Sequence, residues 1–123
     1  MQIGIPKEVF PNEKRAPIIP SSVERLAKKE LKIAVENGLG ASIGISDDEY
    51  QKAGAVVTGR DEILSSSDIV LRLRKPPVEE ITKLKKGSFH ISFLDPFNEA
   101  ALVDAFAKEN ISAISMEMIP RST

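Results

Sequence analysis

Short apolar runs alternate with amphipathic helical patterns along the whole sequence, and this alternation constrains the fold more than any other feature. The apolar runs cover residues 2–5, 32–36, 55–58, 69–73, 89–94 and 112–118. Helical patterns cover 20–30, 46–54, 59–67, 77–87 and 98–110. Strands separated by helices need crossover connections, which make neighbouring strands parallel. The pattern predicts one open α/β domain with a mainly parallel sheet of about six strands and helices on both faces, Rossmann-like or flavodoxin-like.

Two of the helical patterns carry signals for their ends. Ser46 followed three residues later by Glu49 is a capping box, and Gly54 is a typical stop signal. In the last pattern, Asn98 is the expected N-cap and Asn110 the expected exit residue. We therefore expect helices that begin and end near these positions.

Composition excludes several classes of protein. A chain of 123 residues fits a single domain. The formal net charge of -1 argues against nucleic-acid binding, because such proteins usually carry a basic excess. The absence of cysteine excludes disulfides and thiolate chemistry. No apolar run approaches the roughly 18 residues that a membrane-spanning helix needs.

Charged residues follow four of the six predicted strands. Ligands of open parallel sheets bind beyond the carboxyl ends of the strands. The residues found there are Lys7, Lys14 and Arg15 after the first strand, Arg72, Arg74 and Lys75 at the fourth, Asp95 after the fifth and Arg121 after the sixth.

Arg72 and Arg74 are two positions apart, so a regular strand would point them to the same side. One hypothesis is a cleft that binds a carboxylate or phosphate through Arg15, Arg72 and Arg74. The other is that Arg72 and Arg74 are solvated and pair with local glutamates.

Three patterns that look functional are better explained as structure. The glycine-rich stretch 38–44 follows a strand but does not open a helix, so it lacks the amides that would face a pyrophosphate. His90 is the only histidine and lies within a strand, where a packed or hydrogen-bonded role is expected. The acidic trio Asp47, Asp48 and Glu49 occupies a first helical turn, where acids favour the helix dipole. We therefore predict no catalytic acid, base or nucleophile and no metal site.

Three stretches together resemble one known family. They are "IGIPKEVFPNEKRAPIIPSSVERL", "VENGLGASIGISDDEYQKAGA" and "SMEMIPRST". The first two resemble the N-terminal region of the family that joins alanine dehydrogenases with the NAD-binding alpha subunit of proton-translocating nicotinamide nucleotide transhydrogenase. The third is similar to the transhydrogenase branch, where a Pro-Arg turn leads into a loop over the nicotinamide. The resemblance implies that Arg121 lies near bound NAD.

The resemblance also allows the two branches to be weighed residue by residue. Alanine dehydrogenases use an arginine in the first loop, which corresponds to Arg15. They use a lysine at the end of the fourth strand, where this chain has Arg74, with Lys75 next to it. They use a histidine after the fifth strand, where this chain has Asp95. A carboxylate cannot supply the imidazole that handles the proton of an amine or keto acid. The resemblance therefore implies the transhydrogenase branch.

For the whole protein the resemblance implies hydride transfer between NADH and NADP+ coupled to proton translocation. Residues 1–123 would be the truncated N-terminal domain of the catalytic cleft, inactive alone, and the Rossmann domain that holds most of the NAD would lie outside this chain. NADP would bind to a partner subunit or domain. The expected partners are a second copy, forming a homodimer, and the NADP-binding and membrane subunits. The expected location is cytoplasmic and peripheral, at the inner face of the cell membrane, or the mitochondrial matrix in a eukaryote.

Three other functions fit a small α/β domain to different degrees. One alternative is an NAD-dependent amino-acid dehydrogenase similar to alanine dehydrogenase. Another is a non-catalytic α/β module that binds anions. A receiver domain is disfavoured because the positions after the first and third strands are Pro6-Lys7 and Thr58-Gly59 rather than acidic residues.

Overall fold

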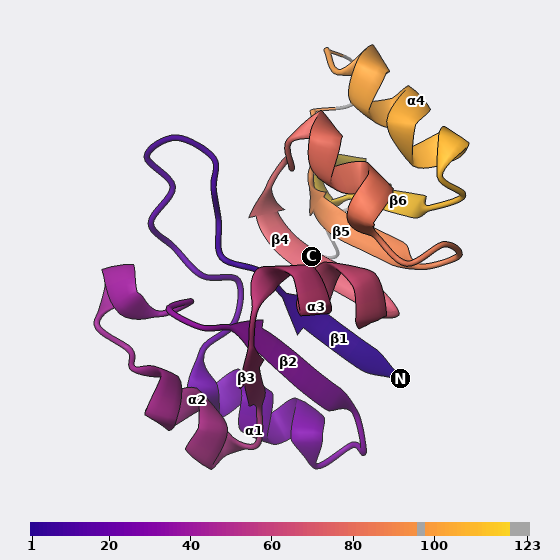
Figure 1. The fold of residues 1–123 in the computed structure, drawn as a ribbon. Helices are drawn as coiled ribbons and strands as arrows, with labels where there is room; N and C mark the ends of the chain where they lie inside the picture. Colours follow the sequence, from indigo (N-terminus) through magenta and orange to yellow (C-terminus); the bar gives the residue numbers. More distant parts are fainter. Residues whose placement is uncertain (96–97, 119–123) are drawn as a thin grey trace.

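The fold is a six-stranded, fully parallel sheet covered by helices. The computed structural model describes residues 1–95 and 98–118 (Figure 1). The strands are β1 (Gln2–Ile5), β2 (Lys32–Glu36), β3 (Val56–Thr58), β4 (Ile69–Arg74), β5 (Phe89–Phe93) and β6 (Ser112–Ser115). Every pair of neighbouring strands is parallel. The predicted α/β class and number of strands are confirmed.

The strand order is β3-β2-β1-β4-β5-β6, the Rossmann order rather than the flavodoxin-like one. The chain moves outward from β1 to β3, then crosses back to β4 and moves outward in the other direction. The direction therefore reverses between β1 and β4. In open α/β sheets the crevice at such a reversal, beyond the carboxyl ends of the strands, is the usual place for a ligand.

The connecting segments are helical. The α-helices are α1 (Pro20–Ala27), α2 (Asp47–Ala53), α3 (Arg60–Ser66) and α4 (Ala100–Lys108), and the 3-10 helices are η1 (Ala41–Ile43), η2 (Val78–Lys83) and η3 (Met116–Met118). The capping box of Ser46 and Glu49 forms as predicted, and Gly54 ends α2 in the left-handed conformation. The glycine-rich stretch 38–44 begins as a turn, as expected, but it also contains η1, a single 3-10 turn between Gly40 and Gly44 that the sequence did not predict. No helix among the described residues is both long and apolar enough to cross a bilayer.

Two expected boundaries differ from the structure. The N-cap of α4 is Glu99 rather than Asn98, because the Asn98 amide donates to the carboxylate of Asp95 instead of capping the helix. The sixth strand ends at Ser115 and the chain continues as η3, although the apolar run extends to 118. Both differences lie at the carboxyl edge of the sheet, where side chains interact with loops.

Each face of the sheet has its own apolar core. On one face α1 and α2 pack against the first strands through Val23, Tyr50, Ile5 and Val35, all fully buried. On the other face α3, η2 and α4 share a second core with the sheet; the buried side chains there include Leu64, Val70, Ile81, Leu102 and Phe106. This two-sided burial explains why the strands are apolar with little alternation.

Candidate functional site: a cleft at the strand reversal

A cavity opens at the carboxyl edge of the sheet where β4 and β5 end. It has a volume of about 340 Å³ and is lined by Arg15, Arg74, Lys75, Phe93, Asp95 and Glu117. Arg15 belongs to the long loop 6–19 that follows β1, and this loop extends beyond the strand ends (Figure 1). The predicted convergence of Arg15 and Arg74 at one edge is therefore observed.

Glu13 holds these two arginines near each other. Arg15 donates two hydrogen bonds to its carboxylate, Nη2 to Oε1 at 2.7 Å and Nε to Oε2 at 2.9 Å. Arg74 Nη1 lies 3.8 Å from the same Oε1, and its guanidinium stacks over the ring of Phe10 at 3.9 Å. The hydrogen bonds from Arg15 lower the pKa of Glu13 to about 2. The cluster therefore keeps a net charge of +1, and the Arg15 side chain remains 70% exposed.

The lining of the cavity also carries acids. The ammonium of Lys75 hydrogen-bonds to Glu99 and lies 3.7 Å from Asp95. The hydrogen bond to Glu99 raises the pKa of Lys75. The backbone N–H of Asp95 donates to Glu117 at 2.7 Å, and Asp95 adopts a positive φ of 53°. The cavity is thus lined by both cations and acids, which suits a ligand with groups of both polarities.

Arg72 does not line this cavity. The strand β4 contains a bulge between Leu71 and Arg74, so the expectation that Arg72 and Arg74 point to the same side is wrong. Arg72 is 1% exposed and donates to Glu80 at 2.8 Å. It pairs with a local glutamate, as one hypothesis expected, but within the protein rather than in solvent.

The ion pair of Arg72 belongs to a larger network on the face covered by α3 and η2. Arg60 makes two hydrogen bonds to Glu80, at 2.6 and 2.8 Å, and a third to Glu36 at 2.8 Å. Burial alone would raise the pKa of Glu80, but the hydrogen bonds from Arg60 and Arg72 outweigh it and hold this pKa at about 2. The network therefore joins segments from different parts of the chain by paired charges.

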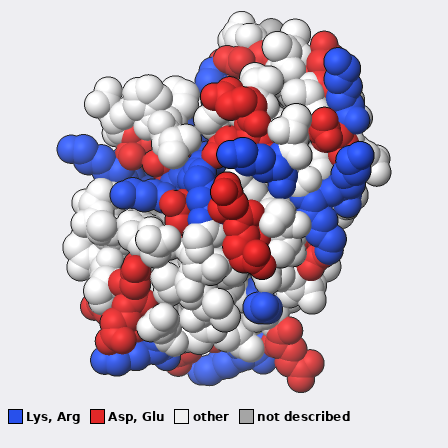
Figure 2. All heavy atoms as spheres, viewed as in Figure 1, with Lys and Arg blue, Asp and Glu red and all other residues white. Residues whose placement is uncertain are grey.

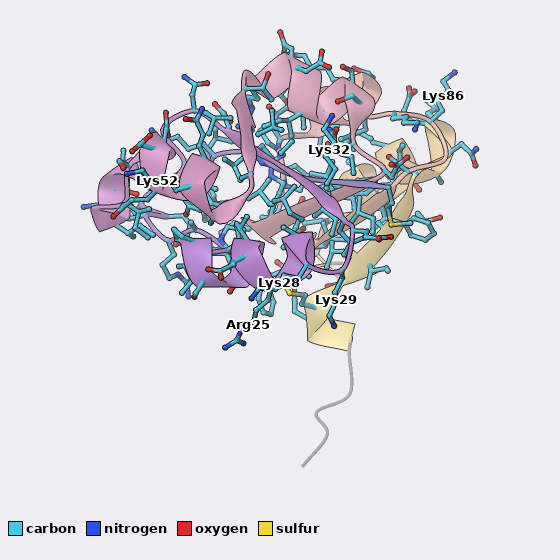
Figure 3. The ribbon with its side chains drawn as sticks, turned by 90° about the horizontal axis from the view of Figure 1, so that it is seen from below. Arg25, Lys28, Lys29, Lys32, Lys52 and Lys86 are labelled. Atoms are coloured by element: carbon cyan, nitrogen blue, oxygen red, sulfur yellow. The ribbon has the colours of Figure 1, made fainter. Side chains whose placement is uncertain are left out.

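Other charged side chains lie away from the cleft. Figure 2 shows basic and acidic side chains intermixed across the face seen in Figure 1, without a large area of one charge. Arg25 in α1 and Lys28 and Lys29 just after its end point outward (Figure 3), and Lys28 pairs with Glu24 at 3.6 Å. All three side chains are exposed.

Arg121 lies outside the described residues, so its predicted place near NAD stays a prediction. The sequence interpretation overlooked Glu8 and Glu13, which organise the arginines. Their signal was present, because both are acids in the same long loop as Arg15. The prediction used only the cations of that loop. No local sequence pattern indicates that a glutamate will form an ion pair with an arginine of a strand distant in the sequence.

The strand order and the cleft at the carboxyl edge define a doubly wound α/β domain. The model of the family "Alanine dehydrogenase/PNT, N-terminal domain" matches residues 4–123. The chain belongs to this family.

Individual relatives agree with this assignment. The chain is 33% identical to NAD(P) transhydrogenase subunit alpha of Cereibacter sphaeroides over 98% of its own length and 23% of the relative. It is 30% identical to alanine dehydrogenase of Methanococcus maripaludis, over 97% of its length and 32% of the relative. The solved transhydrogenase structure from Sinorhizobium meliloti superposes with a TM-score of 0.93 at 32% identity, covering 100% of this chain and 37% of that one. The chain therefore spans about a third or less of the curated relatives that it matches.

Proposed function

We propose that this chain is the N-terminal part of the NAD(H)-binding alpha subunit of a proton-translocating NAD(P) transhydrogenase. Similarity to transhydrogenase alpha subunits supports the proposal. One observation on the cavity supports the proposal independently of sequence similarity. The cavity contains Asp95, at the position where the resemblance implies the histidine of alanine dehydrogenases, and the only histidine of the chain, His90, is 0% exposed beneath α4.

The chemistry of the two branches explains why this difference supports the transhydrogenase branch. Oxidative deamination needs a group that moves protons on the amine and keto acid, a task suited to imidazole. Direct hydride transfer between two nicotinamides needs close approach and orientation, and no proton transfer by a side chain. A cleft with fixed arginines and no accessible imidazole suits the second reaction.

The described residues fit one end of a dinucleotide rather than all of it. The glycine-rich stretch 38–44 contains only a single 3-10 turn, so it offers no α-helix N-terminus for a pyrophosphate. The guanidinium groups of Arg15 and Arg74 suit a phosphate or another anionic group, and Arg121 would serve the carboxamide or a phosphate. When bound, NAD supplies the hydride chemistry. These side chains would bind and orient it, while the rest of the dinucleotide would be held by a Rossmann domain outside this chain.

The proposal includes partners and a location. The complete subunit would form a homodimer and would dock onto an NADP-binding component associated with the membrane subunits. It would be peripheral, on the cytoplasmic face of the cell membrane or in the mitochondrial matrix.

A calorimetric titration with NAD tests the proposal. The 123-residue chain is compared with the longer subunit of which, in this proposal, it would be the N-terminal part. We expect binding by the longer subunit and none in the micromolar range by the chain alone, because most contacts to NAD would lie in the other domain. Micromolar binding by the chain alone would contradict the proposal.

An activity assay separates the two branches of the family. The longer subunit, mixed with its NADP-binding component, should transfer hydride from NADH to NADP+ and should not oxidise NADH with pyruvate and ammonia. Oxidation of NADH that depends on pyruvate would instead favour an amino-acid dehydrogenase.

A further inference from the structure

Glu8 is a buried acid at the cleft whose role the proposed function does not explain. It lies in the loop after β1 and is 9% exposed. Its carboxylate accepts two backbone hydrogen bonds from the end of β4, from the N–H of Leu73 at 2.9 Å and of Arg74 at 3.0 Å. Since β1 ends at Ile5, this carboxylate takes the place that backbone acceptors of a longer β1 would occupy.

Two consecutive N–H groups directed at one carboxylate are not compatible with a regular strand. In a regular strand successive N–H groups point to opposite edges. Here Leu73 and Arg74 direct theirs to the same edge, at the bulge of β4. A bulge leaves backbone groups without their ladder partners, and Glu8 satisfies two of them.

The bulge decides which face of the sheet receives Arg74. Leu71 pairs with Ile91 and Arg74 with Phe93. Because residues two apart in β5 share a face, Leu71 and Arg74 share one as well. Without the extra residue, Arg74 would lie on the face of Arg72, among the buried network. With it, Arg74 reaches Phe10 and Glu13 and lines the cavity.

We propose that Glu8 is a positioning residue: its carboxylate holds the β4 bulge and thereby directs Arg74 toward Arg15, so that the two guanidinium groups form one site for a carboxylate or phosphate of the ligand. This role rests on the cleft of the proposed function, but the orientation of Arg74 can be tested without any cofactor. Glu8 itself touches no ligand in this scheme.

Nuclear magnetic resonance of the 123-residue chain gives the direct test. The side-chain protons of Arg74 lie over the Phe10 ring and should show upfield ring-current shifts. In Glu8→Gln, which loses the charge and one acceptor oxygen, we expect these shifts to be lost while the resonances of Arg72 stay unchanged. Glu8→Asp retains the charge and should restore part of the shifts. Glu79→Gln, an exposed glutamate in η2, is the matched control and should leave Arg74 unchanged.

An unchanged Arg74 signal in a folded Glu8→Gln would overturn the positioning role. If Glu8→Gln does not fold, Glu8→Asp provides the test. Its shorter side chain cannot reach both N–H groups equally, so Arg74 shifts identical to those of the wild type would contradict the positioning role.

A second titration tests the anion site separately. Inorganic phosphate is added and the Nε–H signals of Arg15 and Arg74 are followed. We expect the wild type to bind phosphate and Glu8→Gln to bind it roughly tenfold more weakly, the effect of losing one charge-assisted contact. Equal affinities would remove the link between Glu8 and the site. Absence of phosphate binding by the wild type would overturn the anion site. The positioning role would still be tested by the Arg74 shifts, and the proposed enzyme by the NAD titration.

Discussion

At the scale of single residues, burial determines the charge of His90. Its ring packs against Phe106 with centroids 5.0 Å apart and planes at 47°, and neither ring nitrogen has a hydrogen-bond partner among the described residues. Burial, with a smaller contribution from Arg72, lowers the pKa of His90 to about 3. The sequence interpretation of His90 as a packed strand residue is confirmed. A neutral imidazole in the core cannot act as an acid or base in the cleft.

The low pKa of His90 predicts how stability depends on pH. In the unfolded chain this histidine is protonated below about pH 6.5, whereas in the fold it stays neutral until about pH 3. The free energy of unfolding should therefore fall as pH decreases below 6.5, by at most about 1.4 kcal/mol per pH unit. In His90→Leu the part of this loss between about pH 6.5 and 4.5 should disappear.

Urea unfolding of both proteins across this range measures the effect. The N-terminal amine is present in both and cancels in the comparison. An identical slope in His90→Leu and the wild type would contradict the burial argument.

At the scale of elements, the absence of a side chain lets α3 pack closely on β1. A Cβ at Gly4 would lie 2.0 Å from Ser67 Oγ and 2.8 Å from Ile63 Cγ2, both on the inner side of α3 or at its end. The helix could not approach the strand this closely over any larger residue. This contact lies beside the strand reversal, since Gly4 pairs with Val70 of β4.

Gly4→Ala should lower the free energy of unfolding by about 1–3 kcal/mol, because it overpacks a filled interface. The matched control is Gly59→Ala at the start of α3, where an added Cβ meets nothing within 4 Å. The control should cost about 1 kcal/mol or less, the usual effect at an N-cap. Denaturant unfolding of the two variants gives the comparison, and equal losses would argue against close packing at Gly4.

At the scale of the whole molecule, the buried ion-pair network connects segments that are distant in sequence. Glu36 ends β2, Arg60 begins α3, Arg72 lies in β4 and Glu80 in η2. Arg60 also donates to the carbonyl of Lys7, at the start of the long loop, at 2.7 Å. The network therefore joins both sides of the strand reversal.

Removing one member should be costly, because it leaves a buried charge without its partner. Glu80→Leu should destabilise the fold by about 3–5 kcal/mol, measured by chemical denaturation. Glu79→Leu, at an exposed neighbouring position, should change stability by no more than about 0.5 kcal/mol. A small effect of Glu80→Leu would show that Arg72 finds water or another partner.

The contribution of this network to stability depends on pH within a defined range. The pKa of Glu80 falls from 4.5 to about 2 in the fold. Its contribution to stability is therefore complete above about pH 4.5 and is lost as pH decreases toward 2. Because Glu80 is partly solvated, we expect a contribution of about 1–2 kcal/mol. The free energy of unfolding is measured between pH 4.5 and 2 for the wild type and for Glu80→Gln. We expect the variant to lose less stability over this range, and an equal loss in both proteins would contradict the prediction.

The sequence alone determined the kind of fold and the edge of the sheet that carries the cleft. Apolar runs separated by helical patterns imply parallel strands, and parallel strands bring their carboxyl ends to one edge. Arg15 and Arg74 could therefore be assigned to that edge from their positions relative to the first and fourth apolar runs. The end signals of α2 were also readable, since a capping box depends on residues three positions apart.

Only the tertiary structure decided which arginines face the cavity. The strand order, the bulge of β4 and the burial of Arg72 all depend on contacts between residues far apart in the sequence. Glu8 and Arg74, whose contact supports the bulge, are 66 positions apart. No local pattern encodes such a contact. One extra residue in a strand exchanges its two faces, so the side on which Arg74 lies was set by the packed molecule and not by the spacing of its neighbours.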